Sequence, residues 1–272
     1  MKKCWPENIQ SAVALTFDVD AETLWLSRNP ESEKFPGLIA EGTYGAKVGV
    51  PRILRMLKRM DLKATFFVPC WVLEKHIDII QQVVADGHEI GYHGYLHEVP
   101  ESIEEEKQII LRCKSIMQDL LSITPKGYRA PEWETRPGMA DLLIETGFEY
   151  SSNFMDSDHP YLHCPDLPEP IVELPPSWIL DDSANFFFTF QDPQRVRTIP
   201  SPDMIEKLWF AEFSGIHEEG GCMTLTMHPQ IIGRSSRVQM LEDLLIKIRR
   251  HPGVLIAGGL EIARQAKLAL KS

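Results

Sequence analysis

Short apolar runs alternate along the chain with longer stretches in which apolar residues recur at helical spacing. The short runs have the length of strands, and most are bounded by proline, glycine or aspartate. They lie at residues 12–20, 63–70, 88–93, 127–133, 148–154, 171–178, 222–229 and 253–259. Because strands that alternate with helices form parallel sheets, this pattern predicts an α/β fold.

Residues at helical spacing fill most of the gaps between these runs. The predicted helices are residues 49–61, 77–87, 102–122, 136–147, 201–217 and 236–250. About seven or eight strand–helix units in one chain favour a barrel. A doubly wound open sheet is the alternative, but the chain has no GxGxxG or GxxxxGK[ST] phosphate loop.

Two stretches interrupt the alternation and are predicted to be long irregular loops. Residues 26–47 and 155–200 are rich in Pro, Gly, Asp and Ser and have no clear period. The second contains "SANFFFTFQ" (183–191), which is too apolar for a disordered tail. We expect it to pack over the barrel mouth or into a contact between subunits. No boundary divides the pattern, so residues 1–272 are predicted to form one domain.

The composition narrows the class of protein. Of the 272 residues, 43% are hydrophobic and 25% charged, as in ordinary globular domains. A net charge of −11 argues against a nucleic-acid partner. No apolar run has membrane-spanning length, the N-terminus lacks a signal-peptide pattern, and the five cysteines form no CxxC pair. We therefore expect a cytoplasmic protein with free thiols and no membrane partner.

Polar side chains gather where the predicted strands end. Their positions are Asp18, Asp20, His93, His97, Arg129, Glu132, Asp181, Asp182 and His228. The carboxyl ends of the strands in a parallel barrel surround one mouth, where enzymes of this architecture carry their active sites. The sequence therefore predicts an active site at the C-terminal strand ends, with side chains from several strands.

Two of these histidines have a spacing that suits a metal ion. His93 and His97 are four residues apart, so both imidazoles can face one ion from a helix or a tight turn. An aspartate from another strand would complete a set that leaves positions open for water and substrate. We expect one divalent ion, with Zn²⁺ as the first choice, although the same ligands suit Co²⁺, Mn²⁺ or Fe²⁺.

The two aspartates near the end of the first predicted strand can divide metal binding and proton abstraction between them. Asp18 and Asp20 are two residues apart, so in an extended strand both face the same side. One can bind the ion while the other takes a proton from water, and Arg129 would keep that base ionised and oriented. His228 is expected to protonate the leaving nitrogen, with Asp181 or Asp182 as the carboxylate that orients it.

Together these motifs resemble the polysaccharide deacetylase superfamily of metal-dependent amide hydrolases. The matching stretches, in family order, are "TFDVD" (16–20), "HGYLH" (93–97), "RAPEW" (129–133), "ELPPSWILDD" (173–182) and "LTMHP" (225–229). The resemblance implies a distorted (β/α) barrel of about seven units. It also implies that Asp18 is the base, that Asp20, His93 and His97 bind the metal ion, and that His228 is the acid.

Three details depart from the members that act on polysaccharides. Gly94 follows the first histidine where Ser or Thr is usual, Glu132 adds a carboxylate to the arginine motif, and a long stretch follows "TFDVD". These details are similar to a side branch that holds an intracellular-type peptidoglycan deacetylase, cyclic imide hydrolases and allantoinase-like enzymes. That side branch also implies a homodimer or a homotetramer.

Three functions follow from these observations. The favoured one is hydrolysis of a small amide or cyclic imide by attack of a metal-bound water. The alternatives are deacetylation of an N-acetylated sugar, in a peptidoglycan- or chitin-type polysaccharide, and metal or ligand binding without catalysis. Trp133 and Trp178 are predicted walls of a flat, apolar pocket. Glu132 is predicted to bind a ring N–H, or to pair with Arg129 or a lysine.

Overall fold

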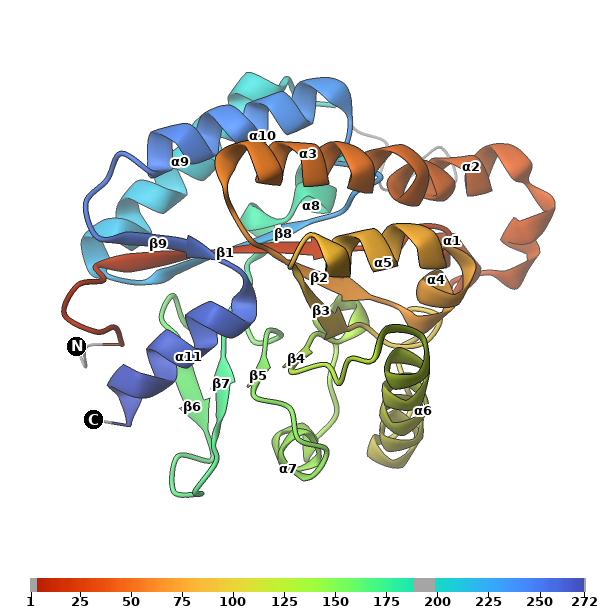
Figure 1. Ribbon diagram of the computed structural model, residues 1–272, viewed down its shortest axis with the longest axis horizontal. Coiled ribbons are helices and arrows are strands. Elements are labelled where there is room, and N and C mark those ends of the chain that lie inside the picture. The colour runs from red at the N-terminus through yellow and green to blue at the C-terminus, as the bar shows by residue number, and fades with distance from the viewer. Residues whose placement is uncertain (1–3, 188–198, 272) are drawn as a thin grey trace.

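The computed structural model describes residues 4–187 and 199–271, which form one curled sheet with helices around it (Figure 1). The strands are β1 (Ser11–Asp18), β2 (Thr65–Val68), β3 (Glu89–Tyr92), β4 (Gly127–Tyr128), β5 (Tyr150–Ser151), β6 (Tyr161–His163), β7 (Ile171–Glu173), β8 (Cys222–Met227) and β9 (Val254–Ala257). Their order along the sheet is β6-β7-β5-β4-β3-β2-β1-β8, and β9 also pairs with β1. The pairs are parallel apart from β6 and β7, which are antiparallel.

Helices cover the sheet on both sides. They are α1 (Thr23–Leu26), α2 (Pro36–Tyr44), α3 (Val50–Met60), α4 (Cys70–Lys75), α5 (Ile77–Ala85), α6 (Ile103–Leu121), α7 (Met139–Glu145), α8 (Asp182–Phe186), α9 (Pro202–Glu219), α10 (Ser235–Ile248) and α11 (Gly259–Leu270). Figure 1 shows α9, α10 and α3 along one side and α11, α7 and α6 along the other. None of the described helices is long and apolar enough to cross a lipid bilayer.

The first described strand, β1, pairs with three other strands of the sheet. One edge pairs with β8 over the register Ala12↔Cys222 to Phe17↔Met227. The other edge pairs with β9 near the start of the strand and with β2 near its end. Every residue of β1 is buried. The side chains at its carboxyl end are therefore held by neighbours on both sides.

The distorted (β/α) barrel expected from the sequence is confirmed. Within the described residues, no continuous ladder of hydrogen bonds joins β8 to β6 or β7. A single parallel bridge between Asp181 and Thr226 spans that side of the sheet instead. It brings the segment after β7 beside the end of β8, and both contribute to the site described below.

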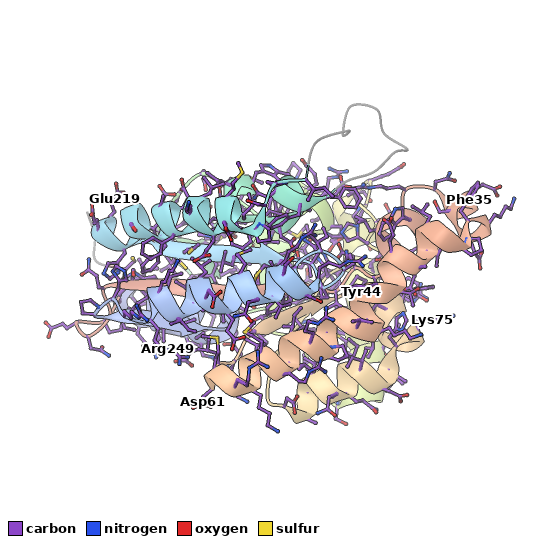
Figure 2. All side chains as sticks on the ribbon, turned by 90° about the horizontal axis from the view of Figure 1, so that it is seen from above. Phe35, Tyr44, Asp61, Lys75, Glu219 and Arg249 are labelled. Atoms are coloured by element: carbon purple, nitrogen blue, oxygen red, sulfur yellow. The ribbon has the colours of Figure 1, made fainter. Side chains whose placement is uncertain are left out.

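The irregular loop predicted at residues 26–47 is wrong, because most of that stretch is helical. After α1 comes a 3₁₀ turn (Pro30–Lys34), and α2 then continues through a wider helical turn (Gly45–Gly49) into α3. Figure 2 shows this helical stretch running from Phe35 at an outer tip, past Tyr44, towards Asp61.

Two glycines of the helical stretch from α2 to α3 allow it to pack closely against neighbouring backbone. A Cβ atom on Gly42 would lie 2.5 Å from the carbonyl oxygen of Ala21. One on Gly49 would lie 2.1 Å from the carbonyl oxygen of Pro229, the residue after His228. Glycine therefore lets the helix touch the backbone of two segments that carry site residues.

The other long stretch, residues 155–200, also holds more regular structure than predicted, because β6 and α8 occur there besides β7, which lies in the predicted strand 171–178. Conversely, the strand predicted at 127–133 is shorter, because β4 ends at Tyr128 and a helical turn follows at Pro131–Trp133. The helices α4 and α11 were not predicted. Most of the "FFFTF" run lies outside the described residues, so its predicted packing over the mouth or between subunits stays a prediction.

Candidate metal and catalytic site

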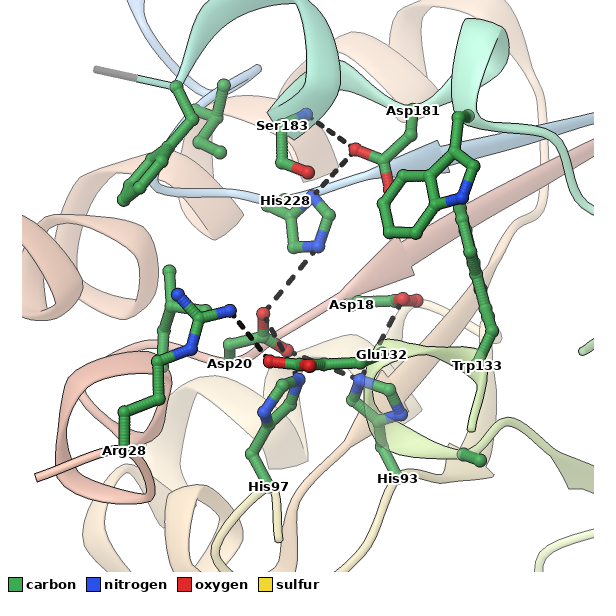
Figure 3. A pocket seen from close by; sticks show the side chains of 15 residues that line it. Asp18, Asp20, Arg28, His93, His97, Glu132, Trp133, Asp181, Ser183 and His228 are labelled. Carbon is green, nitrogen blue, oxygen red and sulfur yellow. Dashed lines mark hydrogen bonds and ion pairs between the residues drawn. The ribbon is translucent and has the colours of Figure 1, made fainter. Parts of the chain in front are cut away.

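A pocket of about 110 Å³ opens at the carboxyl end of the strands, and it is where the predicted site residues meet (Figure 3). It is lined by Asp18, Asp20, Leu24, Arg28, His93, His97, Ala130, Glu132, Trp133, Trp178, Asp181, Ser183, Phe187, His228 and Ile231. Two residues of the predicted set, Arg129 and Asp182, lie directly behind this lining and are fully buried. The structure therefore brings together side chains that are more than two hundred residues apart in the sequence.

Asp20, His93 and His97 form the group best suited to hold a cation. The Nε2 atom of His93 lies 3.4 Å from Asp20 Oδ1, and that of His97 lies 3.8 Å from Asp20 Oδ2. Nitrogen and oxygen ligands of a tetrahedral zinc ion are roughly 3.3–3.6 Å apart, so these separations are close to the required ones. Both carboxylate oxygens of Asp20 are buried and accept no hydrogen bond from the described residues. A buried carboxylate without donors needs a cation, so the residues fit a divalent ion.

The local backbone explains why both histidines of "HGYLH" face Asp20. The chain turns sharply after β3, with positive φ angles of 75° at Gly94 and 62° at His97. Glycine adopts such angles without strain, which accounts for Gly94 at this position. His93 Nδ1 donates to the carbonyl oxygen of Arg129 at 2.9 Å, an arrangement that leaves Nε2 as the free lone pair.

Asp18 is held by a buried arginine. Arg129 Nη1 donates to Asp18 Oδ1 at 2.7 Å and to the Thr16 hydroxyl at 2.8 Å, and Nη2 donates to the Ser152 hydroxyl at 2.9 Å. The guanidinium also lies over the Phe67 ring. The other oxygen of Asp18, Oδ2, faces His93 at 3.8 Å and is the one turned towards the pocket. Asp18 thus has one anchored oxygen and one that can accept a proton from water.

Asp182, rather than Asp181, is the partner that orients His228. The Nδ1 atom of His228 lies 2.6 Å from Asp182 Oδ1, and its backbone N–H donates to the same carboxylate at 3.0 Å. Asp181 is 3.9 Å from Nδ1 and instead caps α8 by accepting from the Ser183 amide at 2.5 Å. The opposite ring atom, Nε2, points at Asp20 Oδ2 from 3.6 Å. His228 therefore faces the centre of the pocket from the side across from His93 and His97 (Figure 3).

Electrostatics distinguish two of the three imidazoles that surround Asp20, those of His228 and His97. Burial disfavours the charged form of His228, but the carboxylates of Asp182 and Asp181 outweigh it and raise the pKa of His228 well above its usual value. Burial lowers the pKa of His97 to about 4, which keeps that ring neutral and able to bind a metal ion. His228 is thus suited to give a proton, and His97 to give a lone pair.

The outer part of the pocket carries a charge pair and two indoles. Arg28 Nη2 lies 2.7 Å from Glu132 Oε1, so Glu132 pairs with Arg28 and not with Arg129 or a lysine. The rings of Trp133 and Trp178 are 4.4 Å apart, with Trp133 buried and Trp178 about half exposed. Arg28 was missed because it follows the first motif in the stretch predicted as a loop, where nothing in the spacing singles out one cation.

Comparison with known proteins agrees with this geometry. A family model described as polysaccharide deacetylase matches residues 7–151. A peptidoglycan deacetylase from Helicobacter pylori is 30% identical to this chain, over 89% of the chain and 91% of that protein. The chain belongs to the polysaccharide deacetylase family. Its membership supports hydrolysis of C–N bonds as the activity.

Solved structures show the same deacetylase-family fold. A Mycobacterium smegmatis protein assigned to the polysaccharide deacetylases superposes with a TM-score of 0.91 at 36% identity, over 97% of this chain and 92% of that one. An allantoinase superposes with a TM-score of 0.84 over 100% of this chain and 95% of that one. Its identity is 22%, so this second likeness concerns the fold alone.

Proposed function

We propose that this deacetylase-family protein hydrolyses a non-peptide amide bond, with a small amide or cyclic imide as its substrate. The observation that carries the proposal is the convergence of three groups on one pocket, namely Asp18 with Arg129, Asp20 with His93 and His97, and His228 with Asp182. Simple ligand binding would need neither a positioned base nor a positioned acid. The arrangement therefore favours catalysis over binding alone.

Each group has a distinct part in the proposed reaction. Asp20, His93 and His97 would hold one divalent ion, Zn²⁺ by preference, which supplies Lewis acidity towards a carbonyl oxygen and makes a nearby water more acidic. Asp18 takes a proton from the attacking water through Oδ2, while Arg129 fixes the orientation of its carboxylate. His228 gives a proton to the leaving nitrogen, and Asp182 keeps that imidazole in position.

The size and walls of the pocket favour a small substrate. A volume of about 110 Å³ is below the several hundred Å³ of sites for larger ligands. Trp133 and Trp178 offer flat apolar surfaces against which a ring can lie. Deacetylation of an N-acetylated sugar is the second candidate, and the similarity to the Helicobacter pylori peptidoglycan deacetylase favours it. It fits the proposed proton transfers equally well.

A substrate panel tests the proposal. Purified protein loaded with Zn²⁺, Co²⁺ or Mn²⁺ is assayed with glutarimide, with small linear amides and with N-acetylated chitooligosaccharides and peptidoglycan fragments. We expect hydrolysis of the ring, with release of one carboxylic acid per turnover. Activity on the sugars alone would replace the first candidate with the second, and no turnover with any loaded ion would favour a binding protein.

Loss of His228 should affect the two substrate classes differently. An amide nitrogen leaves poorly without a proton, whereas the second carbonyl of an imide delocalises the charge of the leaving nitrogen. We therefore expect His228→Ala to lower kcat/KM for an N-acetyl sugar more than for a cyclic imide. His228→Gln serves as a second variant, because Ala leaves the Asp182 carboxylate buried without its imidazole. Full activity of both variants on every substrate would mean that His228 is not the acid.

We further propose a cytoplasmic homodimer or homotetramer. The exposed apolar side chains of the described part of residues 155–200, such as Met155, Leu167 and Trp178, are available for contacts between copies. Light scattering at low micromolar concentration should give at least twice the monomer mass. A single species of 31.0 kDa would contradict this proposal.

A further inference from the structure

Arg28 and Glu132 are charged residues of the pocket that belong neither to the proposed metal site nor to the proposed proton transfers. Arg28 follows α1, which begins shortly after Asp20, and Glu132 lies in the turn after Arg129. Their side chains pair at 2.7 Å and are 43% and 45% exposed, so the pair borders both solvent and pocket. Figure 3 shows the Glu132 carboxylate between Arg28 and the histidines that face Asp20.

The backbone that presents Glu132 is strained. Glu132 and the following Trp133 both have left-handed conformations, with φ angles of 56° and 59°. Two successive non-glycine residues in this region cost free energy that other contacts must offset. The Asn153 side chain accepts from the Ala130 amide at 2.7 Å, and Trp133 packs on Trp178. Strain of this kind at a pocket points to a role for the side chain that it aims inward.

Stability alone does not account for this arrangement. A half-exposed ion pair stabilises a protein little, since solvent screens the charges and two long side chains lose their freedom. Arg28 and Glu132 are both exposed to this degree. The Asn153 hydrogen bond and the packing of Trp133 hold the turn, and the weak surface pair does not explain why the turn directs Glu132 towards the pocket. Recognition of a ligand by Glu132 explains that direction.

We infer that Glu132 and Arg28 form hydrogen bonds with the O=C–NH–C=O edge of a cyclic imide, an inference that rests on the proposed function. That edge presents an acceptor, a donor and a second acceptor in a row. The attacked carbonyl faces Asp20 and its two histidines, the Glu132 carboxylate accepts from the ring N–H, and Arg28 donates to the far carbonyl. Because a guanidinium has five N–H groups, Arg28 can pair with Glu132 and still bind that oxygen.

This binding mode is consistent with the bonds and protons that imide hydrolysis requires. The oxygen of one water bonds to the attacked carbonyl carbon, the C–N bond to that carbon breaks, and the ring opens. Asp18 takes one proton from the water, and His228 gives one to the nitrogen. The product is an acid with a primary amide, whose nitrogen carries the proton directed at Glu132 and the proton from His228. Glu132 thus holds the nitrogen without taking part in proton transfer.

N-methylation of the ring separates the two contacts. N-methylglutarimide keeps both carbonyls and lacks the N–H, so it should lose the contact with Glu132 and keep the contact with Arg28. We expect the wild type to prefer glutarimide by roughly 10- to 100-fold in kcat/KM, the scale of a hydrogen bond to a charged group. In Glu132→Ala the preference should fall to the ratio measured for hydroxide-catalysed hydrolysis of the free rings. Arg28→Ala should lower kcat/KM for both rings by the same factor.

Glu134→Ala is the matched control, because Glu134 is an exposed carboxylate of the same turn that does not line the pocket. It should keep the wild-type preference. Binding is measured separately by NMR saturation transfer from metal-free protein to glutarimide, where the wild type and Glu134→Ala should bind at least about tenfold more tightly than Glu132→Ala.

The outcomes separate this inference from the proposed function. Hydrolysis of both rings with the same ratio in wild type and Glu132→Ala would overturn the inference and leave the proposed imide hydrolysis standing. Equal binding by the metal-free wild type and Glu132→Ala, or no binding by either, would also overturn it. No hydrolysis of any imide by the wild type would overturn both.

Discussion

Replacing Asp18 with asparagine should lower turnover by roughly 10²- to 10⁴-fold, the usual contribution of a positioned base. An amide oxygen can still accept from Arg129, but an amide cannot take a proton from water. The ligand group of Asp20, His93 and His97 is untouched by this change. We therefore expect Asp18→Asn to bind metal as the wild type does, and the assay is kcat on a substrate established by the panel.

Stability has to be followed in the same variant. Asp18→Asn removes the charge opposite a fully buried guanidinium, so the free energy of unfolding should fall. Ser152→Ala removes a different hydrogen bond to Arg129 and shows how far a loosened guanidinium alone affects catalysis. If Asp18→Asn were folded, metal-loaded and close to wild-type activity, Asp18 would not be the base.

Replacing His97 with alanine should abolish stable metal binding. The change removes one of three proposed protein ligands, and metal affinity depends steeply on the number of ligands. Elemental analysis after dialysis against buffer with a trace of the ion compares the metal content of the two proteins. We expect close to one ion per chain in the wild type and almost none in His97→Ala.

His159→Ala is the control for this experiment. His159 lies on the surface near α9, where its ring contacts the carbonyl oxygen of Glu219, and it does not line the pocket. Its loss should leave the metal content unchanged. Equal metal content in the wild type and His97→Ala would mean that the ion binds elsewhere in the chain.

Most of the site was predictable because burying its charged residues at strand ends costs free energy unless they are paired or bound to a cation. Asp18 ends a fully buried strand, and a carboxylate there has to be paired or bound to a cation. The period of two in a strand placed Asp18 and Asp20 on one side, and parallel strands brought the other motifs to the same edge. Physical chemistry of short stretches was sufficient to bring these residues to one edge, whereas the separate roles of Asp18 and Asp20 came from the resemblance to the deacetylase superfamily.

The rest of the site depends on tertiary contacts that no local pattern records. Asp181 and Asp182 are adjacent and chemically identical, and only the path of the chain through the bridge at Asp181 decides which one meets His228. Gly42 lies in the stretch predicted as a loop, but the contact that requires a glycine there comes from the carbonyl oxygen of Ala21 in the folded protein. The partner of Glu132 was unpredictable for the same reason, since Arg28 is more than a hundred residues away.

The pairing of β1 has a consequence for how the protein is made. Its N-terminal half is hydrogen-bonded to β8 and β9, which are synthesised after every other described strand. A nascent chain that stops before Cys222 could pair β1 only with β2 among the described strands and would lack His228. Contacts so distant in sequence slow folding, and they make the proposed catalytic centre one of the last parts to assemble. Backbone amides of β1 should therefore exchange with deuterium only when the whole molecule unfolds.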